Sequence, residues 1–496
     1  MAKYVGSIDQ GTTSTRFIIF DEKGQIVSVS QKEHKQIYPQ PGWVEHDPDE
    51  IWKNTVDVIK DAMGKARVAS SDIASVGITN QRETVLPILR SSGKVLYNAI
   101  VWQDLRGSEC IERLKEVKSE DEVRDKTGLL YSPYFSASKI RWLLDNVPEV
   151  KMHEGDPDMV FMTMDAFILY KLTGKVCTDM TNASRYMLMD IRTGNWDGDM
   201  LSLFGIREEN LPTIASSFGI VYGYTLPGSP FSSPVPVSGM LGDQQAALFG
   251  QVCFSKGEGK CTYGTGCFML QNTGSELFQS SHGLLSTVAY KEEGKAPCYA
   301  LEGSVAIAGS LVQWIRDSLK MVNSAKELDE LAESVPDSGG VYIVPAFSGL
   351  FAPYWRSDAR GVIAGLTGFV TRAHICRAVL ESTAFQAYDI FSQMELDSSI
   401  KISSLKVDGG MTNSFPLMAF QSDILQVPVI RPLIVETTAL GAAYASGLSV
   451  GLWKDTDELR GLWKEQTRWN ATMDDKERRK KVGFWKKAVS RTLDWV

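Results

Sequence analysis

Asp9-Gln10-Gly11-Thr12-Thr13-Ser14-Thr15-Arg16 joins two short apolar segments, Tyr4–Ile8 and Thr15–Phe20, near the start of the chain. Apolar runs of this length, bounded by glycine and hydroxyl residues, are typical of β-strands connected by a tight turn. A second turn at Glu22–Gly24 and a further strand at Gln25–Ser30 follow. The sequence therefore predicts that a three-stranded meander opens the fold.

The first turn also has the composition of a phosphate-binding loop. A carboxylate at a strand end, followed by a glycine and four hydroxyl residues, presents backbone N–H groups and hydroxyl donors to phosphate oxygens. Asp9 would then hold the hydrated Mg²⁺ that bridges those phosphates, and Arg16 would stabilise the transferring charge. Because turns rich in Gly and Thr also occur in ordinary hairpins, this turn alone leaves both interpretations open.

A similar hairpin returns in the second half of the chain. Gly259–Asn272 predicts a strand, a turn and a strand, with Gly264-Thr265-Gly266 at the tip. Between the two hairpins, Pro48–Lys65 predicts a helix capped by Asp47, and Val76–Thr79 predicts a short buried strand.

This repeated plan predicts duplicated α/β lobes that face each other across a cleft. A chain of 496 residues with 43% hydrophobic residues is long enough for two cores, because single cores stop growing at roughly 250–300 residues. We expect an N-terminal lobe over residues 1–251 and a C-terminal lobe over residues 252–496. Pro227–Ser238, rich in Pro, Gly and Ser, is predicted to be a surface loop just before the junction.

A third small-residue turn lies further along the second half. Asp408-Gly409-Gly410 follows a predicted strand at Ser404–Val407 and precedes a helix, a place where backbone can approach a nucleotide closely. Helices are also predicted at Ala306–Leu319, Ala373–Met394 and Thr437–Tyr444. Because the three turns end strands in both lobes, together they favour a purine nucleotide site between the lobes.

The C-terminal tract Asp474–Leu493 combines Val482, Trp485 and Val489 at helical spacing with many basic residues, among them Arg478, Arg479, Lys480, Lys481, Lys486 and Lys487. The favoured interpretation is an amphipathic helix that packs on the second lobe and keeps its basic face in solvent. A binding patch for an anionic partner is the alternative.

Composition excludes several classes of protein. A formal net charge of −8 argues against nucleic acid as a partner, because binding to the phosphate backbone needs a basic surface. The seven cysteines form no CxxC pair and no zinc-ligand spacing, so reduced thiols are expected, with Cys261 and Cys267 in the core. There is no apolar run of about 18 residues and no leader pattern at the N-terminus. We therefore expect a cytoplasmic protein without a membrane span.

Two polar segments suit the binding of a small polyol. Arg82 and Glu83 close the Val76–Thr79 strand, and a fixed guanidinium beside a carboxylate can bind both ends of a vicinal diol. An Arg-Glu pair on an exposed face would merely be solvated, so this segment alone does not distinguish a polyol site from a surface ion pair. Asp243, in Gly242-Asp243-Gln244-Gln245 near the lobe junction, is the candidate base that accepts a hydroxyl proton in phosphoryl transfer; a helix cap is the alternative.

With these motifs in place, the chain resembles the FGGY carbohydrate kinases over nearly its full length, and within them the members that phosphorylate glycerol. The matching pieces occur in the family's order: Asp9–Arg16, Pro41–Pro48, Ile78–Glu83, Tyr97–Gln103, Tyr134–Trp142, Gly242–Gly250, Tyr263–Leu270, Val407–Gly410 and Gly441–Trp453. Gln81-Arg82-Glu83 and Trp102-Gln103 resemble the glycerol-specific members rather than those that act on xylulose, ribulose or gluconate.

The resemblance implies two actin-like (ribonuclease H-like) lobes, each with a mixed sheet flanked by helices, around a central cleft that closes on substrate. It implies that glycerol is held by Arg82, Glu83, Trp102, Tyr134, Asp243, Gln244 and Phe268. It implies that Mg-ATP is held by Thr12, Thr13, Ser14, Arg16, Thr265, Gly309, Gln313 and Gly410. The products would be sn-glycerol 3-phosphate and ADP, as the first step of glycerol utilisation, and we expect a homo-oligomer, either a dimer or a tetramer.

One departure from the family pattern lies in the adenine region. Ser414 occupies a position where the family often has asparagine, and Asn413 lies one residue earlier. Either of these two residues is therefore a candidate for that nucleotide contact.

A second departure concerns regulation. Some bacterial members of the family bind an inhibitory sugar bisphosphate through a basic residue in the loop before Gly242, and others carry a phosphorylatable histidine there. Gly223–Val237 contains no Lys, Arg or His. We predict that neither control operates, so a titration with fructose 1,6-bisphosphate into the millimolar range should leave the activity unchanged. Strong inhibition in that range would contradict the prediction.

Two other classes of function are alternatives to phosphoryl transfer. Gly447-Leu448-Ser449-Val450-Gly451 fits the nucleophile-elbow pattern of hydrolases, but an Ala-rich helix precedes Ser449 and no histidine follows it. A non-enzymatic nucleotide switch would keep the cleft but would have no use for an apolar-walled diol pocket. A kinase for another small polyol is the nearest alternative.

Overall fold

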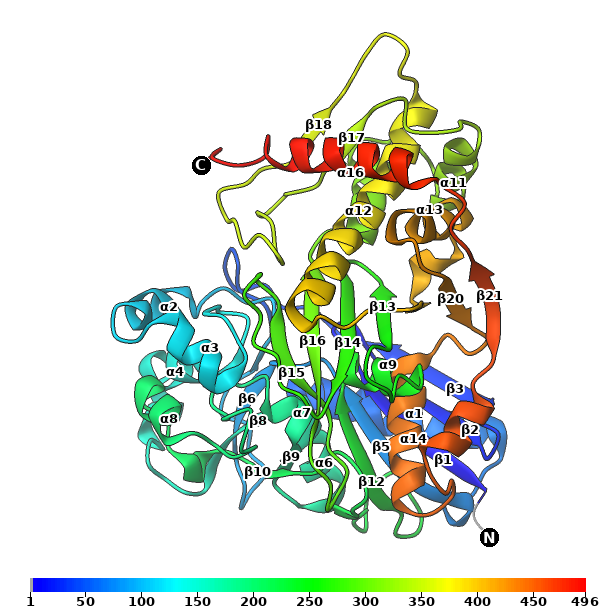
Figure 1. Cartoon of the computed structure of the whole chain (residues 1–496). Coiled ribbons are helices and arrows are strands. Elements are labelled where there is room, and N and C mark those ends of the chain that lie inside the picture. Colours follow the sequence, from blue (N-terminus) through cyan, green and yellow to red (C-terminus); the bar gives the residue numbers. More distant parts are fainter. Residues whose placement is uncertain (1–2) are drawn as a thin grey trace.

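Two mixed β-sheets with matching strand orders organise the protein, and the computed structural model describes residues 3–496 (Figure 1). The first sheet contains β1 (Tyr4–Gln10), β2 (Ser14–Asp21), β3 (Ile26–Glu33), β5 (Ile73–Asn80), β11 (Gly223–Tyr224) and β12 (Pro236–Gly242). The second contains β13 (Gly259–Tyr263), β14 (Cys267–Gly274), β15 (Leu285–Tyr290), β16 (Cys298–Val305), β19 (Leu405–Asp408), β20 (Val429–Pro432) and β21 (Glu465–Trp469).

The order of the first sheet is β11-β12-β5-β1-β2-β3, and that of the second is β15-β16-β14-β13-β19-β20-β21. In the first sheet, β1 pairs antiparallel with β2 and parallel with β5. In the second sheet, β13 pairs antiparallel with β14 and parallel with β19. The predicted duplication of a hairpin-led α/β lobe, and with it the fold class, is confirmed.

Helix α1 (Pro48–Ala66) follows the first meander and packs against β2 and β3. The Asp47 carboxylate accepts hydrogen bonds from the backbone N–H groups of Asp49 at 2.9 Å and Glu50 at 3.4 Å. These bonds satisfy two of the helix's free N–H groups, and Pro48 needs no such partner because it has no N–H. The predicted start and cap of this helix are confirmed.

A long insertion between β5 and β12 builds the flank of the first lobe. Its small sheets contain β6 (Val85–Leu89), β7 (Ala99–Ile100), β8 (Met159–Thr163), β9 (Cys177–Asp179) and β10 (Thr213–Ala215), joined by β4 (Glu45–His46). Its helices are α2 (Ser108–Lys115), α3 (Glu120–Thr127), α4 (Ser136–Asn146), α5 (Pro148–Met152), α6 (Met164–Thr173), α7 (Met180–Ala183) and α8 (Gly198–Phe204).

The prediction of a surface loop over Pro227–Ser238 is wrong in part. Phe231 and Val235 are buried in the core of the first lobe, and β12 already begins at Pro236. The prolines of this segment suggest a loop, but proline is also tolerated at the first residue of a strand, which is the position of Pro236.

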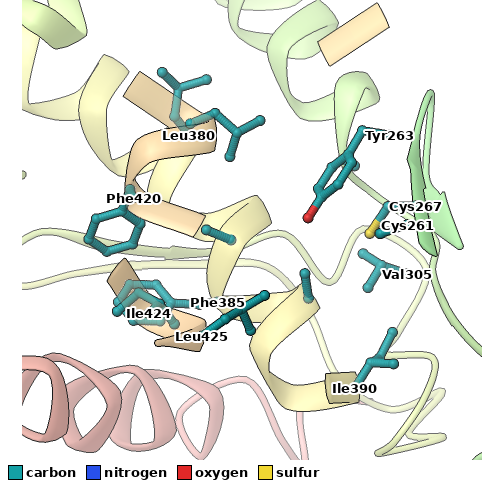
Figure 2. Close-up of a cluster of buried hydrophobic side chains, with 14 of the residues drawn as sticks. Cys261, Tyr263, Cys267, Val305, Leu380, Phe385, Ile390, Phe420, Ile424 and Leu425 are labelled. Carbon is teal, nitrogen blue, oxygen red and sulfur yellow. The ribbon is translucent and has the colours of Figure 1, made fainter. Parts of the chain in front are cut away.

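The second lobe is covered by α10 (Gly309–Gln313), α11 (Ala325–Glu333), α12 (Arg372–Ser398), α13 (Phe415–Leu425) and α16 (Asp475–Val489), with a small hairpin of β17 (Tyr342–Val344) and β18 (Val362–Ala364). Its core joins one face of the second sheet to α12 and α13, and Figure 2 shows Tyr263, Cys261 and Cys267 in this core. All seven cysteines are free thiols, as the sequence predicted.

The helix predicted at Ala306–Leu319 begins three residues later than expected. The backbone N–H groups of Ala308 and Gly309 bond to the Thr265 and Gly264 carbonyls instead of starting a helix. After α10 the chain continues through a π-helical turn at Trp314–Ser318.

Two helices cross where the lobes meet. In Figure 1, α14 (Thr437–Ser449, orange) lies beside the strands of the first sheet, although in the chain it stands between β20 and β21 of the second. It packs on α9 (Asp243–Gly250), and α15 (Thr456–Leu462) follows it. A Cβ atom on Gly441 would lie 1.8 Å from the Ala246 carbonyl oxygen. Glycine is therefore required at this crossing, which fixes α9 and places Asp243 at its first position.

The C-terminal tract forms α16, as predicted, and buries Val482, Trp485 and Val489 against the second lobe. The Trp485 indole N–H and the Tyr354 hydroxyl both donate to Oδ2 of Asp389 on α12, at 2.7 and 2.9 Å. Burial raises the pKa of Asp389 to about 6, although these two hydrogen bonds oppose the rise.

Asp389→Asn should stabilise the protein more at pH 8 than at pH 5. The folded state holds the Asp389 proton up to about pH 6, whereas an unfolded aspartate loses it near the ordinary pKa of 3.8. This side chain's contribution to stability is therefore complete below pH 3.8 and lost as the pH rises through 6. A shift of about two units corresponds to roughly 3 kcal/mol. Denaturant unfolding of both proteins at the two pH values measures the difference, and an equal effect at both would contradict it.

Among the helices of residues 3–496, none is both long and apolar enough to cross a membrane.

Candidate active site

The β1–β2 hairpin ends in a tight loop. The Gly11 N–H donates to the Ser14 carbonyl at 2.9 Å and closes the turn, while the Thr13 side chain is exposed. Asp9, at the end of β1, lies opposite Arg16 in the strand register. Burial raises the pKa of Asp9 to about 6, the Arg16 charge lowers it, and Glu436 and Asp243 raise it further.

Three side chains hold this loop from behind. The Gln36 amide N–H donates to the Thr12 carbonyl at 3.0 Å, and the Gln81 amide N–H donates to the Gly11 carbonyl at 3.4 Å. His46 lies between the two amides, with Nε2 2.9 Å from the Gln36 oxygen and Nδ1 3.2 Å from the Gln81 nitrogen. Because an amide oxygen can only accept and an amide nitrogen can only donate, these contacts fit a neutral His46 with its proton on Nε2. Burial of the imidazole also favours the neutral form, because it lowers the pKa of His46 to about 3.

Three side chains surround the Arg16 guanidinium. Its Nη1 lies 2.7 Å from Glu436 and 3.9 Å from Asp9, and its Nε donates to Gln31 at 3.0 Å. Glu436 directly precedes α14, so this ion pair joins the predicted phosphate loop to the crossing between the lobes.

The second hairpin meets two other turns of the second lobe. The Gly309 N–H donates to the Gly264 carbonyl at 3.0 Å, and a Cβ on Gly309 would lie 2.6 Å from the same oxygen. Gly409 has φ of +90°, and a Cβ there would lie 2.3 Å from the Tyr263 carbonyl oxygen. The turns at Gly264–Gly266, Gly309 and Gly409 therefore pack backbone against backbone and form one platform of the second lobe. Nucleotide contacts at this platform stay a prediction.

Around this platform, Thr265, Gln313 and Asn413 are exposed. Ser414 is buried and caps α13: its hydroxyl donates to Asp329 at 2.7 Å and accepts from the Leu417 N–H at 3.4 Å. Of the two candidates for the adenine contact, only Asn413 presents its side chain to solvent.

The end of β5 supplies a buried guanidinium and a buried carboxylate. Arg82 and Glu83 are 2% and 1% exposed. Glu83 has φ of +62°, a left-handed conformation that a glutamate adopts only at a cost, so its geometry is imposed by the surrounding structure. The Arg82 Nε atom lies 3.2 Å from Asp243, whose side chain is 32% exposed at the cleft.

Aromatic side chains stand beside this cluster. Trp102 and Tyr134, both half-buried, meet edge to face with ring centroids 5.6 Å apart. The Trp102 indole N–H donates to the Thr12 hydroxyl at 3.0 Å. The apolar wall predicted for a polyol is thus in direct contact with the predicted phosphate loop.

The second sheet presents a polar face to this region. Lys260 on β13, Leu270 on β14 and Glu302 on β16 lie side by side in the strand register, and Phe268 is opposite Ser304. Paired residues share a face of the sheet and alternate residues return to it, so Phe268 lies on the face that carries Lys260 and Glu302. The opposite face carries Cys261, Tyr263 and Cys267 into the core, which Figure 2 shows.

Lys260 and Arg82 supply positive charge near Asp243. The Lys260 ammonium donates to the Gln244 side-chain oxygen at 2.5 Å, across the lobe boundary. Burial raises the pKa of Asp243 above its ordinary value, and the charges of Arg82 and Lys260 oppose that rise. The two cations favour the ionised form of Asp243, which is the form that accepts a proton.

Sequence reasoning missed four charged residues of the site: Arg185, Lys260, Glu302 and Glu436. Lys260 and Glu302 each carry a charge into a buried strand, where charges are rare unless paired or functional. That signal could have found them, whereas Arg185 and Glu436 carry no comparable signal.

The chain matches one protein family over both halves. Residues 4–250 match the N-terminal domain of the FGGY family of carbohydrate kinases, and residues 259–450 match its C-terminal domain. A glycerol kinase from Chloroflexus aggregans is 54% identical over 501 residues, which cover 100% of both chains. A glycerol kinase from Nocardia farcinica is 53% identical with the same coverage.

Solved structures agree. The crystal structure of Plasmodium falciparum glycerol kinase with ADP is 41% identical and matches with a TM-score of 0.93, covering 99% of this chain and 98% of that chain. Gluconate kinase from Lactobacillus acidophilus matches with a TM-score of 0.86 at 22% identity, covering 99% of this chain and 96% of that chain, which is a likeness of fold alone.

Proposed function

This chain belongs to the FGGY family of carbohydrate kinases, and we propose that it is a glycerol kinase. A glycerol kinase is an ATP-dependent phosphotransferase with an alcohol group as acceptor. It transfers the γ-phosphoryl group of Mg-ATP to a terminal hydroxyl of glycerol, giving sn-glycerol 3-phosphate and ADP. The observation that carries the proposal is the meeting of Arg82, Glu83 and Asp243 beside an aromatic wall that contacts the Thr12 loop.

Each part of the acceptor pocket has a chemical task. Arg82, Glu83, Tyr134 and Gln244 bind the hydroxyls, since together they offer both donors and acceptors in fixed positions. Trp102 and Phe268 pack against the carbon chain. A molecule with hydroxyls on adjacent carbons and an apolar edge suits both kinds of wall.

The nucleotide occupies the cleft between the two hairpins. Thr12, Thr13, Ser14 and Arg16 face the phosphates from the first lobe, and Thr265, Gly309, Gln313 and Gly410 form the platform of the second. Asn413 makes the adenine-side contact, because the Ser414 hydroxyl is already bound to Asp329.

Asp9 fits the role of a magnesium ligand. Within residues 3–496, no group hydrogen-bonds its carboxylate, and no cluster of three or more metal-ligating side chains exists. Mg²⁺ binds through one or two carboxylates, waters and substrate phosphates rather than an all-protein cage, so a single free carboxylate beside the phosphate loop suits it. When bound, the ion would neutralise charge on the phosphates.

Catalysis then rests on alignment and charge. The Asp243 carboxylate accepts the proton of the glycerol hydroxyl as its oxygen forms a bond to the γ-phosphorus, and the bond from that phosphorus to the β,γ-bridging oxygen breaks. ADP leaves with the electron pair, and the proton passes from Asp243 to solvent. Arg16 and the backbone of the two hairpins stabilise the charge on the phosphoryl group.

The test is ATP consumption coupled to product identification, with glycerol, dihydroxyacetone, xylulose or no acceptor. Rapid turnover that depends on glycerol and yields glycerol 3-phosphate is expected. Equal ATP hydrolysis without an acceptor, or a sugar that far outruns glycerol, would overturn the substrate while leaving the family intact.

A further inference from the structure

Glu302 of the second lobe binds the guanidinium of Arg82, a residue of the proposed acceptor site in the first lobe. Arg82 Nη1 and Nη2 donate to the two oxygens of Glu302 at 2.6 and 2.8 Å. Both side chains are buried, and 220 positions separate them in the chain. Charge-assisted bidentate pairs of this kind are short and fix orientation as well as position.

Arg185 completes the cluster. Its Nε donates to Glu83 at 2.6 Å and its Nη2 donates to Glu302 at 3.2 Å. Glu302 therefore binds Arg82 directly and reaches Glu83 through Arg185, and Arg82 and Glu83 are two of the side chains that bind the diol in the proposed function. Burial alone opposes ionisation of Glu302, but the charges of Arg185 and Arg82 outweigh it and lower its pKa to about 2.

Because a guanidinium is planar and rigid, the edge that Glu302 binds determines which edge of Arg82 remains for other partners. Its five N–H bonds lie in one plane, two pairs of them along separate edges. Glu302 occupies the Nη1/Nη2 edge of Arg82, and the Gln245 side-chain oxygen accepts the other Nη1 hydrogen at 3.2 Å. The Nε/Nη2 edge remains, and its Nε lies 3.2 Å from Asp243.

We propose that Glu302 is a positioning residue for the acceptor alcohol: it binds one edge of Arg82 so that the other edge faces the diol beside Asp243. The inference rests on the proposed function of the Arg82 site and adds a residue from the opposite lobe to it. Since Glu302 sits on β16, four residues before the turn that leads to Gly309, the strand that orders the acceptor also continues to the nucleotide platform.

The test compares Glu302→Gln with the wild type in KM for glycerol, KM for ATP and kcat. Glutamine keeps the shape but replaces one accepting oxygen with an N–H₂ group that opposes the Arg82 N–H. Removing one partner of a buried hydrogen-bonded charge pair typically costs a factor of about 30 or more, so the KM for glycerol should rise by at least that factor. The KM for ATP and the affinity for ADP should stay within about threefold, because the nucleotide turns do not contact Glu302.

Glu381→Gln is the matched control. Glu381 is also a buried carboxylate of the second lobe, bound by Arg377 at 3.0 Å, but it lies on α12 away from the cleft. Its substitution should leave both KM values within about threefold. If Glu302→Gln does not fold, Glu302→Asp carries the same test, since it keeps the charge but withdraws it from Arg82.

An unchanged glycerol KM in a folded Glu302 variant overturns the inference. An equal loss of glycerol and ADP binding also overturns it, because the residue would then merely hold the lobes together. The proposed function is judged separately, by the acceptor that the wild type prefers. If that acceptor is another polyol, the ratio of variant to wild-type KM is measured with it.

Discussion

Asp243→Asn should lower kcat by about 10²-fold or more while the protein folds and binds nucleotide normally. An amide cannot accept the hydroxyl proton, and general-base catalysis typically supplies a factor of 10²–10⁴. The substitution also removes a charge that faces Arg82 at 3.2 Å, so some rise in the KM for glycerol is expected. Steady-state kinetics with product identification, together with ADP titration, separates the two effects.

The pH profile gives an independent check. Because burial raises the pKa of Asp243, the base loses its activity at a higher pH than an ordinary aspartate would, and kcat/KM for glycerol should fall as the pH drops through that value. The variant should lack this acidic limb. Asp389→Asn, which changes a buried carboxylate bound by Trp485 and Tyr354 rather than by residues of the proposed site, should keep kcat within about threefold. A variant at position 243 that retained wild-type kcat would remove Asp243 from the mechanism.

The hairpins of both lobes could be predicted from sequence because their signals are local. Glycine and hydroxyl residues between short apolar runs specify a turn with its two strands, and Asp47 followed by Pro48 specifies a helix start. The repeat of the hairpin predicts that the two lobes share a plan, but the strand order of each sheet appears only in the structure. The prediction of a surface loop at Pro227–Ser238 failed because it rested on the polar, proline-rich composition of the segment. Composition does not show that Phe231 and Val235 pack in the core of the first lobe.

The sequence predicted only those residues of the candidate site that belong to a recognisable motif. Arg82, Glu83 and Asp243 stand in recognisable segments, and the structure brings them together. Glu302 has no motif of its own, and its partner Arg82 lies 220 positions away. Which carboxylate binds which edge of a guanidinium depends on the register of β14 with β16 and on the seating of the two lobes, neither of which a single sequence expresses.

Gly409→Ala and Gly410→Ala should separate folding from nucleotide binding at adjacent positions. A Cβ on Gly409 would lie 2.3 Å from the Tyr263 carbonyl oxygen, and the residue has φ of +90°, so backbone must move. Strain and overpacking of this kind should together lower the free energy of unfolding by about 3 kcal/mol, and the displaced turn should raise the KM for ATP at least tenfold.

A Cβ on Gly410, by contrast, meets nothing within 4 Å in the free protein. Gly410→Ala should therefore leave the free energy of unfolding within about 0.5 kcal/mol of the wild type, as for a surface substitution. If the nucleotide approaches this backbone as proposed, the methyl group nevertheless weakens ADP binding several-fold, while the KM for glycerol is unchanged. Denaturant unfolding and ADP titration of the pair measure both effects. Full nucleotide affinity in Gly410→Ala would place the adenosine elsewhere on the platform, because the added methyl group can disturb only what binds there.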